Sequence, residues 1–286
     1  MKKTSTYLPS IILSVLLVFS LMISAAVLLM DLNFTAGKLK NMASENNIDS
    51  KIYVEIEKYY KDKFNSSGIP GNVYMDAIND SYLKNCEEIY IEAAFEALNG
   101  NGKMNVTVPK NKELENSITD FFFDFAEKNN YQKDEKFEAK LNSAKENAYF
   151  TIGSFCDVYK FSTMSGHGVL PKLAKLYSNR MILTVCSIAV TVIIFLMLLV
   201  VKRKNKATAL YWYGTSCTVA GLLGSIPGIY LVATKFFDSF SIKQAPVFTA
   251  FTSFMYKYSG YFIAVHISFI VLGAIFFVVY GLVKER

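Results

Sequence analysis

One histidine lies inside an apolar stretch near the C-terminus and has the clearest potential for chemistry. His266 is near the middle of the uncharged run 258–283, and Ser268 follows two residues later. An ionisable side chain at the centre of a membrane span is a candidate functional site, because burying it in hydrocarbon costs free energy. The alternative is a neutral imidazole that forms a hydrogen bond with a neighbouring helix.

Hydroxyl side chains in another apolar run offer such a partner. Thr184, Ser187 and Thr191 recur at i, i+3 and i+7 within 181–201, so a helix would place them on one face. The apolar runs contain no Asp, Glu, Lys or Arg that could relay a proton to the imidazole. We therefore favour a structural hydrogen bond between His266 and this row over a proton pathway.

The four cysteines divide into two pairs. Cys186 and Cys217 fall within apolar runs, where cysteine commonly serves as a small packing residue. Cys86 and Cys156 fall within the polar block 31–180. If that block lies in an oxidising compartment, the second pair is a candidate disulfide. Two free buried thiols are the equal alternative, because sequence does not show the geometry that a disulfide requires.

Familiar catalytic motifs are absent from the sequence. It has no H-E-x-x-H, no phosphate-binding glycine loop with lysine and no G-x-S-x-G. Only two histidines occur, His167 and His266, and a histidine-based metal cluster is therefore not expected. Catalysis thus has no sequence support, and we expect no cofactor and favour a non-enzymatic protein.

Four long uncharged runs must position these side chains. Each is long enough to cross a hydrocarbon core of about 30 Å as a helix. The sequence therefore predicts an all-α membrane protein with four transmembrane helices and a helical extracytoplasmic domain inserted between the first and second. The predicted order is a cytoplasmic tail 1–7, a first span 8–30, an extracytoplasmic domain 31–180, a second span 181–201, a basic cytoplasmic loop 202–206, a third span 207–234, an aromatic outer loop 235–257, a fourth span 258–283 and a cytoplasmic end 284–286.

Basic residues at the ends of the runs set the predicted orientation. Lysines and arginines concentrate in 1–7, 202–206 and 284–286, and such clusters stay in the cytoplasm. Ser24, Ala25 and Ala26 resemble a signal-peptidase site, but the apolar run continues past them to Met30. The run 8–30 is therefore predicted to be an uncleaved signal anchor rather than a signal peptide. We expect a multi-pass protein of the plasma membrane with both termini in the cytoplasm. A bacterial source is expected because only three of the 30 basic residues are arginine.

The net charge of +6 is therefore explained by membrane orientation, and no nucleic acid partner is expected.

Within 31–180 the apolar residues recur mainly at helical spacing, and a block of this size can bury a core of its own. A compact helical ectodomain is predicted there.

Small residues form a stripe along the third span. Gly214, Cys217, Gly221, Gly224 and Gly228 recur at alternating spacings of three and four residues, which allows another helix to approach closely. A homo-oligomer interface and packing within one four-helix bundle explain the stripe equally well.

Two hypotheses of function follow. The first is a non-enzymatic envelope protein that senses a ligand or binds a protein partner through its helical ectodomain, while the spans anchor it in the lipid bilayer. The alternative is a transporter or channel subunit with a pore or polar site involving His266.

Overall fold

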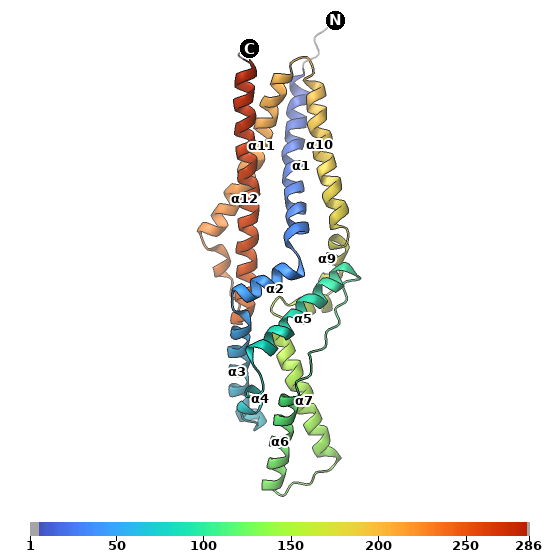
Figure 1. Ribbon diagram of the computed structural model, residues 1–286, viewed down its shortest axis with the longest axis vertical. Helices are drawn as coiled ribbons and strands as arrows, with labels where there is room; N and C mark the ends of the chain where they lie inside the picture. The colour runs from blue at the N-terminus through green and yellow to red at the C-terminus, as the bar shows by residue number, and fades with distance from the viewer. Residues whose placement is uncertain (1–5, 285–286) are drawn as a thin grey trace. The chain divides into compact units, whose positions relative to one another are not determined.

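The computed structural model describes residues 6–284, and within that range the chain forms helices and turns without any β-strand. Four helices are long and apolar enough to cross a membrane (Figure 1). They are α1 (Tyr7–Asn33), α10 (Arg180–Val201), α11 (Lys206–Ala233) and α12 (Ala245–Lys284). The all-α class and the four membrane-spanning candidates are thus confirmed. Residues 1–5 and 285–286 of the predicted cytoplasmic ends lie outside the described range.

The described chain divides into two compact units. Unit 1 contains residues 6–35, 178–240 and 254–284, and unit 2 contains Ala36–Tyr177 and Ser241–Ser253. Unit 1 therefore holds most of the four long helices, and unit 2 holds most of the polar block predicted to be a helical domain.

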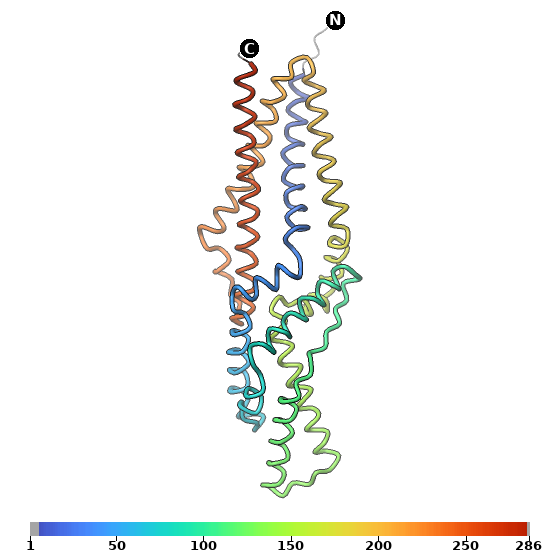
Figure 2. The backbone as a smooth tube through the Cα atoms, viewed as in Figure 1, coloured from blue at the N-terminus to red at the C-terminus, as the bar shows by residue number. Residues whose placement is uncertain are grey.

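In unit 1, α1 packs along α10 and α11, and the backbone trace shows α1 and α10 side by side (Figure 2). Leu17 of α1, Leu198 of α10 and Tyr213 of α11 are almost fully buried in their shared core. The Tyr213 ring stacks on Phe195 with centroids 3.7 Å apart, and its hydroxyl donates to the Phe195 carbonyl at 2.7 Å. Ser14 and Ser216 hydroxyls pair at 2.7 Å across α1 and α11.

The outward faces of these helices are apolar, which is the pattern that lipid contact requires. Val185 and Val278, for example, expose 61% and 63% of their surface. At one end of the first two long helices the Arg180 side chain lies 3.2 Å from the Asp31 carboxylate, so charge appears where the apolar stretches end.

The last helix begins earlier than its apolar run. The predicted outer loop 235–257 contains a short 3₁₀ helix, Phe236–Ser239, and then the first turns of α12, which continues without a break to Lys284. Pro246 is tolerated in the first turn of a helix, and no proline follows it. Nothing in the sequence therefore ends the helix before its last basic residues.

Unit 2 is built from eight helices and the segment 241–253. The helices are α2 (Ala36–Glu45), α3 (Ile48–Ser67), α4 (Asn72–Met75), α5 (Asp80–Asn99), α6 (Lys112–Lys128), α7 (Glu135–Cys156), α8 (Phe161–Gly166) and α9 (Val169–Tyr177). Its core is formed by side chains such as Ile52, Leu83 and Ile152, each fully buried. Asn79 and Asp134 cap the N-termini of α5 and α7. Each side chain accepts a hydrogen bond from the backbone N–H of the residue three positions later.

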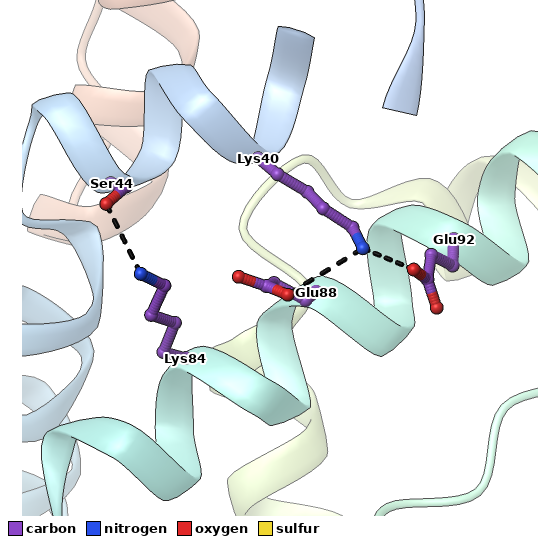
Figure 3. Close-up of polar contacts among 5 residues, drawn as sticks. All are labelled: Lys40, Ser44, Lys84, Glu88 and Glu92. Carbon is purple, nitrogen blue, oxygen red and sulfur yellow. Dashed lines mark hydrogen bonds and ion pairs between the residues drawn. The ribbon is translucent and has the colours of Figure 1, made fainter. Parts of the chain in front are cut away.

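An ion cluster joins α2 to α5 within unit 2 (Figure 3). The Lys40 ammonium group contacts the Glu92 carboxylate and lies 3.7 Å from Glu88. One turn later on α2 and one turn earlier on α5, Lys84 donates to the Ser44 hydroxyl at 3.4 Å. These contacts come from side chains spaced by four residues on each helix, so they follow the line along which the helices meet.

Candidate functional site

Unit 2 contains an aromatic pocket of about 760 Å³, a volume suited to a small molecule. Its walls come from α3, α4, α7 and the segment 241–253. We call it the tyrosine pocket and define it by Tyr59, Tyr60, Lys63, Tyr74, Lys140 and Phe155. None of its described lining residues is Asp, Glu, His or Cys.

Stacked rings form one wall of the tyrosine pocket. Tyr60 of α3 and Tyr74 of α4 lie almost parallel, with centroids 4.0 Å apart and planes inclined by 5°. Tyr59 meets both Tyr60 and Phe155 edge to face, at 5.5 and 5.7 Å. Tyr60 lies on the buried stripe of α3, four residues after Ile56, so the packing of α3 fixes the orientation of this wall.

The Tyr60 hydroxyl is a buried polar group that has no well-formed hydrogen bond among residues 6–284. Tyr60 is only 6% exposed, and the Thr151 hydroxyl lies nearby without forming a well-shaped hydrogen bond to it. Burial raises the pKa of the Tyr60 phenol, and the neighbouring Tyr74 and Tyr59 raise it further. Burial also raises the pKa of Tyr74 to about 12. Both phenols therefore stay protonated near neutral pH, and the Tyr60 hydroxyl is a donor without a well-formed hydrogen bond among the described residues.

Such a group is unusual, since the large majority of buried polar atoms have a partner. An unpaired buried donor costs roughly 1–3 kcal/mol, which a bound acceptor would recover. The unpaired hydroxyl therefore marks the tyrosine pocket as a place where a ligand oxygen or nitrogen would be stabilised.

His266, the residue singled out by its position in an apolar run, is fully buried in unit 1. Its Nδ1 lies 2.7 Å from the Phe262 carbonyl oxygen of the preceding turn, which makes Nδ1 the protonated nitrogen. Its Nε2 has no hydrogen-bond partner among the described residues. The Phe262 ring covers the imidazole, with centroids 4.0 Å apart.

The predicted hydroxyl row has different partners. Thr184, Ser187 and Thr191 each donate to a carbonyl of α10 itself, at 2.9 to 3.0 Å, and Thr191 also pairs with Ser24 of α1 at 3.0 Å. Ser268 likewise donates to Val265 of its own helix. Among the hydrogen bonds of residues 6–284, none joins His266 to the row.

His266 lies instead against the glycine stripe of α11. A Cβ atom at Gly224 would lie 1.9 Å from His266 Cδ2, and one at Gly221 would lie 2.6 Å from the His266 carbonyl oxygen. Gly214 and Gly228 similarly face Phe277 and Ile263 of α12. The stripe is therefore covered by α12 of the same chain.

The cysteines predicted as a candidate disulfide meet in the core of unit 2. Cys86 and Cys156 are both fully buried, free thiols in this structure. Hydrogen bonding between the two thiols lowers the pKa of Cys86 and raises that of Cys156. Cys217 is buried in α11, whereas Cys186 is exposed on the apolar surface of α10.

Comparison of the chain with protein-family models, curated proteins and solved structures gives no match. Functional inference therefore depends on the chemistry of its own side chains. The tyrosine pocket was not predicted from the sequence, although Tyr59, Tyr60 and Lys63 share one face of the predicted helix. The sequence signal for the tyrosine pocket is the adjacent pair Tyr59 and Tyr60 in that helix.

Proposed function

We propose that this chain is a membrane-anchored binding protein, in which unit 2 holds a ligand in the tyrosine pocket and the four long helices anchor it in the bilayer. The observation that carries the proposal is the hydroxyl of Tyr60, a lining residue, which is buried and has no well-formed hydrogen bond within the described chain. Recognition of an acceptor group by this hydroxyl would stabilise the occupied state of unit 2.

The proposed topology places unit 2 outside the cytoplasm of a bacterial cell. Its support is the basic residues Lys202, Arg203 and Lys204 between α10 and α11, together with Lys284 at the end of α12. In this topology α1 is a signal anchor, and unit 2 meets molecules that reach the cell surface.

The lining favours binding over catalysis. A serine nucleophile is usually activated by a neighbouring imidazole or carboxylate, and the described lining supplies neither. Aromatic faces, hydroxyls and amide groups are instead the usual components of small-molecule binding sites.

Filling the pocket tests the proposal. Ala144 lines the pocket on α7, whereas Asn142 is exposed on the same helix outside the lining. The full chain, purified from its native membrane into nanodiscs, is examined by native mass spectrometry as wild type, Ala144→Trp and Asn142→Trp. We expect a small molecule to be retained by the wild type and Asn142→Trp and lost from Ala144→Trp.

Thermal unfolding of each variant checks that it is folded. Retention of the same molecule by folded Ala144→Trp, or its absence from all three proteins, contradicts the proposal.

The unpaired Nε2 of His266 supports a second candidate, a transporter or channel subunit with a polar site between α11 and α12. Solute flux into liposomes containing wild type or His266→Ala tests it. A flux that the substitution abolishes supports this candidate, and equal background flux from both proteins removes it.

A further inference from the structure

The tyrosine pocket has a charge pattern that indicates what it binds. Lys63 of α3 and Lys140 of α7 are its only charged lining residues within the described chain. Neither forms an ion pair with a described carboxylate. Lys63 lies 5.7 Å from the centre of the Tyr59 ring, which places its ammonium group beside the aromatic wall.

Two cations supplied by different helices, with no carboxylate in the lining, produce a positive potential at the pocket. A concave site lined by one sign of charge concentrates ligands of the opposite sign. Among the other lysines of unit 2, Lys40, Lys61 and Lys133 have acidic partners. Lys51, Lys84 and Lys160 instead donate to hydroxyl or carbonyl oxygens. What characterises the tyrosine pocket is that two such lysines line one cavity whose described lining contains no carboxylate.

The remaining lining is suited to a flat apolar body. Tyr59, Phe155 and the stacked pair formed by Tyr60 and Tyr74 present ring faces and edges, which pack favourably against another ring. The Tyr60 hydroxyl is a directional donor buried behind the same wall, and a ligand acceptor reaches it once the side chains around it shift.

From this arrangement, and resting on the proposed function, we infer that the pocket binds an amphiphilic organic anion: a ring system that carries an acidic group and a further oxygen acceptor. The rings lie against Tyr59 and Phe155, the anionic group is attracted to Lys63 and Lys140, and the second oxygen accepts from the Tyr60 hydroxyl. Carboxylates and sulfonates share this chemistry, and the test uses a carboxylate.

A matched pair of probes isolates the charge. 6-Hydroxy-2-naphthoate and 6-hydroxy-2-naphthamide have the same rings and hydroxyl and differ in the charge of one group. Binding of each to the full chain in zwitterionic nanodiscs is measured by equilibrium dialysis, with empty nanodiscs subtracted. We expect the acid to bind about fivefold to tenfold more tightly than the amide, since two solvent-exposed charge contacts contribute modestly.

Variants identify the residues responsible. The double variant Lys63→Gln/Lys140→Gln should remove the preference for the acid, whereas Lys145→Gln, on α7 outside the lining, should retain it. Tyr60→Phe, which deletes only the hydroxyl, should weaken both probes about equally. Added salt should weaken the acid and leave the amide unchanged, because exposed charges are screened.

The outcomes separate this inference from the proposed function. Equal binding of acid and amide, with both lost in Ala144→Trp, overturns the anionic class and keeps the pocket as a binding site. Acid binding that Ala144→Trp does not affect overturns the use of the pocket itself. Failure of the acid to bind saturably at millimolar concentration also overturns the anionic class.

Discussion

The imidazole of His266 lies so close to Gly224 that a Cβ atom at position 224 would be 1.9 Å from its Cδ2. The glycine and the histidine come from the two helices α11 and α12 of unit 1, and the missing side chain of one makes room for the ring of the other. The buried histidine and the glycine stripe are therefore parts of a single packing arrangement.

The first prediction concerns this contact. Gly224→Ala should lower the thermal unfolding temperature of the full chain in detergent by several degrees, because the ring and both helices must shift. Gly260→Ala on α12 is the matched control, since a Cβ there meets nothing within 4 Å. The control should be neutral or slightly stabilising, as alanine is the better helix former. Equal unfolding temperatures for the two variants would show that Gly224 does not face the imidazole.

The helices of unit 1 were predictable from sequence because their signal is local. Long uncharged runs and basic flanks identify α1, α10 and α11 within a few residues. Helix α12 begins at Ala245, before the predicted span 258–283, since Ala245 and its neighbours form helix equally well although they are less apolar than the span. Hydropathy identifies the residues that favour contact with lipid, but it does not identify the residue at which a helix begins.

Pairing between helices was harder to predict. The hydroxyls of Thr184 and Ser187 are satisfied within α10, since serine and threonine can donate to carbonyls three or four residues earlier. The hydroxyl row therefore does not need His266, whose Nε2 is left without a hydrogen-bond partner among the described residues. The tyrosine pocket depends on Tyr60 and Tyr74 meeting across a turn, which is a tertiary relationship that periodicity does not contain.

A second prediction compares two glycines with left-handed backbones in unit 2. Gly68 and Gly102 have φ of 69° and 77°, but only at Gly102 would a Cβ strike the chain, 2.2 Å from Pro171 Cα. Gly68→Ala should cost about 1 kcal/mol from backbone strain alone. Gly102→Ala should cost about 2–4 kcal/mol, because α9 must also move. Chemical denaturation followed by circular dichroism measures both, and a cost for Gly102→Ala no larger than that for Gly68→Ala would refute the close approach.

A third prediction concerns the cluster in Figure 3, where Lys40 contacts Glu92 and Glu88 of α5. Lys40→Met should destabilise unit 2 by about 1 kcal/mol, since it leaves two carboxylates without their shared cation. Lys61→Met removes one exposed partner of Glu57 on the same helix and should cost less than about 0.5 kcal/mol. The difference should shrink in 1 M salt; a difference that persists there would have to come from packing of the Lys40 chain.

The last prediction follows from Glu87 of α5, which is 2% exposed and has an unpaired Oε1. Burial raises its pKa from 4.5 to about 8, with Asp49 and Glu88 adding to the rise and Lys84 opposing it. Between these two values the folded chain holds a proton that the unfolded chain has released. Stability must therefore fall as pH rises from about 4.5 to about 8, and it has no further slope from this group on either side.

Glu87→Gln should remove that slope, because an amide is neutral at every pH in the range. The loss avoided by pH 8 is on the order of 3–5 kcal/mol, so the variant should unfold at a higher temperature than the wild type at pH 8 and at a similar one near pH 4.5. Glu96→Gln, exposed on the same helix, is the control and should follow the wild type. Parallel unfolding profiles for wild type and Glu87→Gln across this range would mean that Glu87 is ionised in the fold. Its carboxylate would then have to reach water or a cation, because an isolated charge is not stable among buried side chains.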